Sequence, residues 1–117
     1  MSNILEKIIQ YKKESLEIIK KDNTLDFLEK KIKTINTFLN FKETINKNKG
    51  VSLISEIKKA SPSAGILVKD FDHLEIAKMY INNGSTCLSV LTEEKYFLGK
   101  LGYIKDIKDK FKIPILA

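Results

Sequence analysis

The stretch "VSLISEIKKASPSAG", residues 51–65, decides how the chain is expected to fold. Its first seven residues form a mostly apolar run, which is typical of a buried strand. Two lysines and a Ser-Pro-Ser-Ala-Gly segment follow, and proline and glycine there favour a turn. The stretch therefore predicts a strand over residues 51–57 that ends in a loop. An acid and a base, Glu56 and Lys58, lie where this strand stops.

Helix-like and strand-like segments alternate after the loop. They are a helix at 72–84, an apolar strand-like run at 85–91, a helix at 101–111 and a strand that begins at 113. Asp72 can cap the first of these helices, Glu75 completes a capping box, and Gly84 ends the helix. The order strand, helix, strand, helix, strand predicts parallel strands joined by right-handed crossovers. The fold class is therefore α/β, either a doubly wound sheet or part of a (β/α)8 barrel.

Chain length limits this choice. A (β/α)8 barrel takes about 250 residues, and three strands cannot close a barrel. The 117 residues are therefore expected to form either a small open sheet or the first part of something larger.

Residues 1–49 show helical patterns only, and the chain changes character near Gly50. The first helix is predicted to start at Asn3, with a glutamate three residues later as in a capping box. A second helix is predicted from about Thr24, with one apolar stripe that includes Leu25, Leu28, Ile32 and Ile35. A third is predicted from Asn36 to about Ile45. The predicted organisation is thus a helical extension over 1–49 and an α/β part over 50–117.

The charge of the chain raises the question of nucleic-acid binding. The formal net charge is +6, yet all 21 positively charged residues are lysines. Nucleic-acid modules usually rely on arginine for forked contacts to phosphates and guanine edges. The lysines are also interspersed with acids, as on solvated helix faces. No nucleic-acid partner is therefore expected, although an anionic small-molecule substrate agrees with the charge.

The sequence also carries no sign of a membrane segment or of export. No apolar run approaches the roughly 20 residues that a transmembrane helix needs. The N-terminus lacks the apolar core of a signal peptide. A single cysteine, Cys87, cannot form an internal disulfide, and it is expected to be a small buried apolar group. We expect a cytoplasmic protein with no membrane partner.

Glu56 and Lys58 are the first candidate site residues. Residues two apart in a strand face the same way, about 6–7 Å apart. Both lie at the carboxyl end of the first strand, where parallel α/β folds place their ligands. An acid and an amine there can bind a carboxylate, exchange protons, or only hold each other in an ion pair without chemistry. Spacing alone does not separate these readings.

The loops after the two complete strands supply further candidates. In the first loop, the hydroxyls of Ser61 and Ser63 more often bond the local backbone than a ligand. In the second, Tyr96 and Phe97 lie in a polar, glycine-bounded segment and can cover an aromatic ligand. Folding back onto the local core is the commoner fate of such aromatics. His73 is expected at the surface. Neither a metal cluster nor a Ser-His-Asp set can be assembled, so metal chemistry is not expected.

These motifs together resemble the indole-3-glycerol phosphate synthase family. The resemblance covers nearly the whole chain and is strongest in "LISEIKKASPSAG", "DFDHLEIAKMY", "CLSVLTEEKYFLGKLGYIKDIK" and "IPILA", in that order. It implies a (β/α)8 barrel preceded by a helical extension that helps to cover the substrate site. It also implies a carbon–carbon lyase (a carboxy-lyase) of tryptophan biosynthesis that needs no cofactor. The implied substrate is 1-(2-carboxyphenylamino)-1-deoxyribulose 5-phosphate, whose indole ring is closed with loss of CO2 and water.

The resemblance assigns roles to four residues. Lys58 matches a lysine that contacts the substrate and takes part in proton transfer, and Glu56 matches the glutamate that orients it or accepts a proton. Ser61 matches a substrate-contacting serine, and Phe97 matches an aromatic residue that lies against the substrate. Catalytic residues are therefore expected to be Glu56 and Lys58, and substrate-binding residues Ser61 and Phe97.

The chain departs from the family pattern in two ways. Many relatives carry basic residues at the positions of Ala64 and Val68, which can alter the dynamics of the first loop or the affinity for substrate. In the family, the third strand also continues into a lysine that is the general acid, at the position after Ala117. That lysine, a glutamate of the fourth strand and the phosphate-binding loops are not among the 117 residues. The chain therefore resembles the first half of the enzyme, and alone it is expected to be inactive.

Two other kinds of function are compatible with the sequence. The chain can be a non-catalytic half-barrel that acts only with a complementary C-terminal half. It can also be a basic helical binding module that uses residues 1–49, although the absence of arginine and of aromatics interleaved with lysines argues against this.

Overall fold

The computed structural model describes residues 3–117, and the chain forms two compact units. The first unit ends at Phe38 and the second covers Leu39–Ala117. The sequence predicts a boundary between residues 49 and 50, where helical patterns give way to alternating strands and helices. The compact units divide earlier, between Phe38 and Leu39. The third helix, α3 (Phe41–Lys47), consequently belongs to the same unit as the strands.

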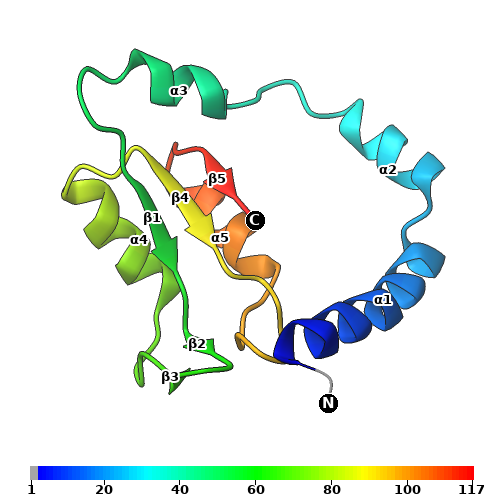
Figure 1. The fold of residues 1–117 in the computed structure, drawn as a ribbon. Coiled ribbons are helices and arrows are strands. Elements are labelled where there is room, and N and C mark those ends of the chain that lie inside the picture. Colours follow the sequence, from blue (N-terminus) through cyan, green and yellow to red (C-terminus); the bar gives the residue numbers. More distant parts are fainter. Residues whose placement is uncertain (1–2) are drawn as a thin grey trace. The chain divides into compact units, whose positions relative to one another are not determined.

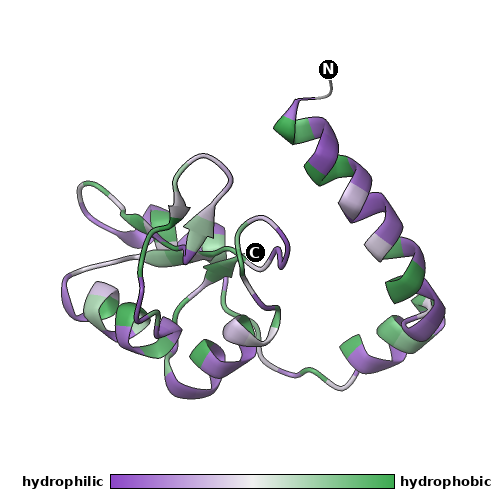
Figure 2. Cartoon of the chain, turned by 90° about the horizontal axis from the view of Figure 1, so that it is seen from below, coloured by the Kyte–Doolittle hydropathy of each residue, from purple (hydrophilic) through white to green (hydrophobic). Residues whose placement is uncertain are grey.

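The first unit contains two helices, α1 (Ile4–Asp22) and α2 (Leu25–Ile32) (Figure 1). Each has a polar N-cap residue. The side chain of Asn3 accepts a hydrogen bond from the Glu6 amide at 2.9 Å, and Thr24 accepts one from Phe27 at 3.2 Å. Both predicted starts are confirmed. Apolar and polar residues alternate along both helices (Figure 2), and none of their residues is buried.

Two details of the predicted helices are wrong. The second helix ends at Ile32, so Ile35 lies beyond it and does not continue its apolar stripe. The third helix begins at Phe41 rather than near Asn36. The reason is that the side chain of Asn40 accepts a hydrogen bond from the Glu43 amide at 2.9 Å and so forms the cap.

A three-stranded parallel sheet lies at the centre of the second unit. Its strand order is β1-β4-β5, and it consists of β1 (Ile54–Ile57), β4 (Cys87–Val90) and β5 (Ile115–Leu116). In the sequence, β1 is followed by a short antiparallel hairpin of β2 (Ala60–Ser61) and β3 (Gly65–Ile66), and then by α4 (His73–Asn82), before the chain reaches β4. Helix α5 (Gly102–Lys110) precedes β5. The predicted α/β class and the parallel pairing are confirmed.

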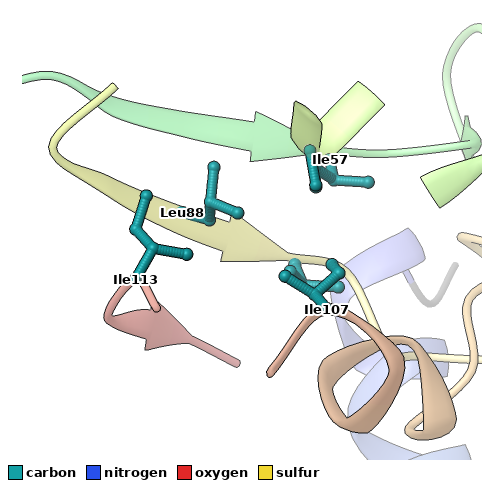
Figure 3. Close-up of a cluster of buried hydrophobic side chains, with 6 residues drawn as sticks. Ile57, Leu88, Ile107 and Ile113 are labelled. Carbon is teal, nitrogen blue, oxygen red and sulfur yellow. The ribbon is translucent and has the colours of Figure 1, made fainter. Parts of the chain in front are cut away.

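The core lies between one face of this sheet and the two helices that follow its strands. Figure 3 shows the cluster, in which side chains from β1, β4 and α5 meet. Its buried members are Ile57, Ala77, Leu88, Val90, Ile107 and Ile113. Each fully buried Leu or Ile side chain contributes roughly 1.5–3 kcal/mol to stability, so this layer holds the sheet and helices together.

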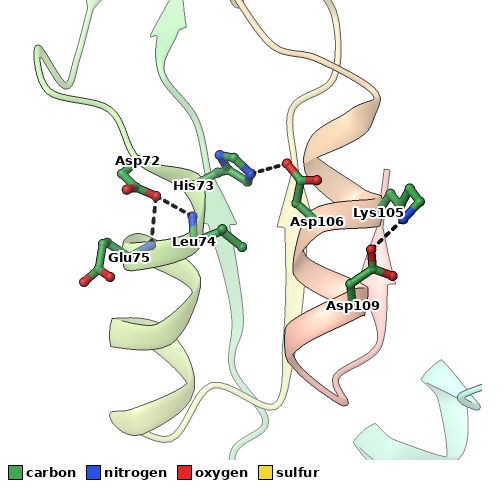
Figure 4. Close-up of polar contacts among 7 residues, drawn as sticks. All are labelled: Asp72, His73, Leu74, Glu75, Lys105, Asp106 and Asp109. Atoms are coloured by element: carbon green, nitrogen blue, oxygen red, sulfur yellow. Dashed lines mark hydrogen bonds and ion pairs between the residues drawn. The ribbon is translucent and has the colours of Figure 1, made fainter.

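Polar contacts cap the start of α4 and join α4 to α5 (Figure 4). The carboxylate of Asp72 accepts hydrogen bonds from the amides of Leu74 and Glu75 at 2.9 and 3.2 Å, which confirms the predicted cap. His73 is not simply a surface residue. Its Nε2 lies 2.8 Å from the Asp106 carboxylate of α5, and its ring stacks on Tyr103 at 4.3 Å.

The opposite face of the sheet is exposed on its two edge strands, β1 and β5, whereas Cys87 of the central strand is buried there. Residues that pair in register across parallel strands point to the same face, so Glu56, Ser89 and Leu116 share this face. Ile54 and Leu116 are 44% and 52% exposed there, whereas Ser55 and Ile57 on the helix side are buried. Among residues 3–117, no helix has the length and apolar character that crossing a membrane requires.

Candidate active site

Glu56 and Lys58 form an ion pair at the carboxyl end of β1. The Lys58 Nζ lies 2.9 Å from Glu56 Oε1, and the two side chains are 33% and 48% exposed respectively. Glu56 belongs to the exposed face of the sheet, away from the helices. Solvent and a ligand can therefore reach both charged groups, which agrees with a site as well as with a simple ion pair.

The backbone beneath this pair is held on both sides. The hydroxyl of Tyr80, on α4, donates a hydrogen bond to the Glu56 carbonyl oxygen at 2.9 Å. The amide of Leu91, after β4, donates to the Ile57 carbonyl at 3.1 Å. Sequence reasoning missed Tyr80. Its position three residues after the buried Ala77 was the available signal, because a tyrosine on an inward helix face needs a hydroxyl partner.

Ser61 lies in the hairpin that follows β1, paired with Gly65. Its hydroxyl oxygen accepts a hydrogen bond from the Ala64 amide at 3.2 Å and lies 3.4 Å from the hydroxyl of Ser63. The expectation of a bond to the local backbone is confirmed for Ser61. Gly65 has φ +68°, a conformation that glycine adopts without strain. The sequence predicted a turn here, and the structure adds the two short strands.

Glu93 organises the loop after β4, and sequence reasoning missed it as well. Its carboxylate accepts hydrogen bonds from the amides of Lys95, Tyr96 and Phe97 at 3.0, 2.7 and 3.0 Å. Its carbonyl oxygen accepts another from Gly99 at 2.8 Å. The only signal in the sequence was a glutamate a few residues after a strand, in a loop with a glycine.

The four predicted site residues lie at the carboxyl ends of neighbouring strands. Glu56 and Lys58 touch each other at the end of β1, and Ser61 follows in the hairpin. Phe97 is half-buried in the loop after β4, the strand that pairs directly with β1. The topology therefore brings the first and second loops to the same end of the sheet, where the strands have their carboxyl ends.

The described residues were also compared with the arrangements that metal binding and thiol chemistry require. Within residues 3–117, no group of three or more His, Cys, Asp or Glu side chains is arranged to hold a metal ion. Cys87 is fully buried, as predicted, and burial raises the pKa of its thiol. A neutral, inaccessible thiol is a poor nucleophile.

Comparison with known proteins decides the family. The family model for indole-3-glycerol phosphate synthase matches residues 5–117. The chain belongs to this family. Three curated members, all named indole-3-glycerol phosphate synthase, come from Desulforamulus reducens, Aliarcobacter butzleri and Alkaliphilus metalliredigens. They are 42%, 46% and 42% identical to the chain, each over 97% of its length.

The chain spans less than half of these relatives. It covers 43%, 44% and 43% of the proteins from the three organisms. The indole-3-glycerol phosphate synthase fold is a (β/α)8 barrel, and the described residues form three parallel strands of it without a closed barrel. The resemblance found in the sequence motifs is thus confirmed for the family and for the fold.

Proposed function

We propose that the complete protein is an indole-3-glycerol phosphate synthase, a carboxy-lyase of tryptophan biosynthesis. It converts 1-(2-carboxyphenylamino)-1-deoxyribulose 5-phosphate into indole-3-glycerol phosphate with loss of CO2 and water. The observation that carries the proposal is the accessible ion pair of Glu56 and Lys58 at the carboxyl end of β1, in a chain that matches this family from residue 5 to residue 117. The reaction needs no cofactor.

Lys58 suits contact with an anionic substrate. An ammonium group has three donor hydrogens, and the contact with Glu56 at 2.9 Å uses one of them. Two therefore remain for the substrate carboxylate or for the oxygen that leaves as water. Glu56 can orient the ammonium group and accept a proton as the ring closes.

Ser61 and Phe97 are proposed to contact the substrate from the two loops. The Ser61 oxygen is occupied by the Ala64 amide, but its hydroxyl hydrogen can be donated to a substrate oxygen. The half-buried Phe97 ring can pack against the aromatic ring of the substrate. The general acid and the phosphate-binding loops are proposed to come from residues outside these 117.

Turnover by the complete protein tests this function. The purified protein is incubated with the phosphorylated substrate and, in parallel, with the same compound after phosphatase treatment. We expect one CO2 and one indole-3-glycerol phosphate for each substrate consumed, and a large loss of kcat/KM without the phosphate, because the phosphate positions the reacting atoms. No indole product from the phosphorylated compound would refute the proposal.

One observation favours a second candidate, a half-barrel that acts with a complementary half. Among the described residues, β1 and β5 each pair only with β4, so the sheet has two open edges there. Its exposed face carries the apolar side chains of Ile54 and Leu116. Both features suit the remaining strands of a barrel, whether these belong to the same chain or to a second one.

A further inference from the structure

We propose that Glu93 is a positioning residue, which fixes the loop after β4 and so holds Phe97 in place for the substrate. This inference rests on the proposed function, because it assigns the loop a task in that reaction. It concerns a residue that does not touch the reacting atoms itself.

The first argument is the number of backbone groups that one side chain satisfies. Glu93 Oε1 accepts the Lys95 amide at 3.0 Å, while Oε2 accepts the amides of Tyr96 and Phe97 at 2.7 and 3.0 Å. Residues 91–99 are neither helix nor strand. The shape of this loop therefore depends on the carboxylate, since backbone amides that no regular element satisfies need another acceptor.

The second argument is the chemistry of the acceptor. An ionised carboxylate accepts at two oxygens and donates nothing, and its bonds to N–H groups are stronger than neutral ones. A glutamine side chain has one acceptor oxygen, and its NH2 group would face N–H donors. Because Glu93, Tyr96 and Phe97 are all partly buried, water cannot fully replace the lost acceptor.

The third argument is the closure of the loop at its far end. The Glu93 carbonyl accepts the Gly99 amide at 2.8 Å, and an ideal Cβ on Gly99 would stand 2.2 Å from the Leu91 carbonyl oxygen. The backbone of Leu98 is in the left-handed region (φ +51°), which is uncommon for residues other than glycine and is found mainly in tight turns. Phe97 therefore lies between the bond to the carboxylate and the closure of the loop, so the backbone that carries its ring is held on both sides.

These contacts also distinguish Glu93 from Glu56, the glutamate proposed to be catalytic. Both of its carboxylate oxygens are occupied by backbone amides. Glu56, in contrast, has an exposed carboxylate whose described contact is Lys58. Glu93 consequently acts through the loop backbone and Phe97, and Glu56 acts on the substrate.

The test uses Glu93→Gln in the complete protein, with Glu94→Gln as the matched control. Glu94 is the exposed neighbour, and the described residues give its side chain no hydrogen bond or ion pair. We expect Glu93→Gln to lower kcat/KM about 10- to 100-fold, because a displacement near 1 Å can cost that much. Glu94→Gln is expected to stay within about twofold, as surface substitutions usually do.

A double-mutant cycle with Phe97→Leu shows whether Glu93 acts through Phe97. If it does, the loss in kcat/KM from Glu93→Gln is much smaller in the Phe97→Leu background than in the unsubstituted protein. Equal losses in the two backgrounds, or a Glu93→Gln variant as active as Glu94→Gln, would overturn the inference. A general loss of folding is excluded by a far-UV circular dichroism spectrum at the assay temperature that matches that of the unsubstituted protein.

Hydrogen exchange separates this inference from the proposed function. Amides 95–97 are expected to exchange faster in Glu93→Gln than in Glu94→Gln, whatever the enzyme does. If the unsubstituted protein shows no turnover, the proposed function fails and the role of Glu93 in that reaction fails with it. If turnover is normal and exchange at 95–97 is unchanged by Glu93→Gln, the inference alone fails.

Discussion

Gly99 lies so close to the end of β4 that no side chain fits there. An ideal Cβ would stand 2.2 Å from the Leu91 carbonyl oxygen and 2.9 Å from the carbonyl carbons of Leu91 and Thr92. All three atoms belong to the backbone, which cannot turn aside as a flexible side chain can. The loop that carries Phe97 thus depends on a residue without a Cβ as well as on the Glu93 carboxylate.

Substitution of Gly99 by alanine should be destabilising, whereas substitution of Gly102 by alanine should not. Gly99→Ala is expected to cost about 1–3 kcal/mol of unfolding free energy, as overpacking does. Gly102, the first residue of α5, has open space where its Cβ would lie. Gly102→Ala is expected to be neutral or to stabilise by about 0.4–1 kcal/mol. Urea unfolding of the complete protein measures both, and equal midpoints for the two variants would contradict the prediction.

The candidate site was predictable from the sequence only in part. The pairing of Glu56 with Lys58 followed from the period of a strand, which places residues two apart on one face. The role of Glu93 did not follow, because three amides converge on its carboxylate only once the loop has folded. Tyr80 was missed for the same reason, since its partner is a backbone carbonyl 24 residues away in sequence.

Among the elements, α4 shows most clearly how local signals and tertiary contacts combine. Its start is set by the Asp72 side chain, which bonds the amides of Leu74 and Glu75. Its inner face buries Ala77 in the core. His73 then joins the helix to Asp106 of α5, so the two helices behind the sheet are linked by a polar contact as well as by packing.

Removal of the α4 cap should weaken the fold by a predictable amount. Asp72→Ala is expected to lower the unfolding free energy by about 1 kcal/mol, because the two amides lose their acceptor. Asp72→Asn keeps a cap oxygen and serves as the control, with a loss of a few tenths at most. Chemical denaturation of the complete protein distinguishes them. A loss from Asp72→Asn as large as that from Asp72→Ala would show that the cap bond is not the cause.

Sequence patterns located helix starts well where the capping residue was recognised, and they located α3 and the β2–β3 hairpin least well. The starts of α1, α2 and α4 were predicted correctly because Asn3, Thr24 and Asp72 each accept an amide hydrogen bond. The start of α3 was placed too early, since a second asparagine, Asn40, forms the cap. The β2–β3 hairpin was missed because strands of two residues leave no periodic pattern.

At the scale of the whole molecule, the sheet of the second unit is covered by helices on one face only, among the described residues. Helices α4 and α5 cover one side of the sheet, while Ile54, Glu56 and Leu116 face outward on the other. In a (β/α)8 barrel this second face points inward, where further strands would cover it. The exposed face of the sheet therefore carries part of the candidate site, and it is also the face that the remaining strands of a barrel would cover.

The 117-residue chain alone is expected to show no measurable turnover. Loss of the general acid by itself should cost about 10²- to 10⁴-fold, and the absence of a phosphate clamp removes positioning as well. Addition of a separately produced segment that completes the barrel should restore activity, and a chain that carries Glu56→Gln should restore far less. The assay is indole-3-glycerol phosphate formation. Turnover by the chain alone at the rate of the complete protein would contradict this account.

The most direct test of the proposed function compares two lysines in the complete protein. Lys58→Met removes the ammonium group at the end of β1, and Lys78→Met removes one from the exposed side of α4, where the described residues give it no ion pair. The measurement is kcat for indole-3-glycerol phosphate formation. We predict a fall of about 10²- to 10⁴-fold for Lys58→Met and no more than about a twofold change for Lys78→Met. Equal kcat values for the two variants would contradict the assignment of the active site to the end of β1.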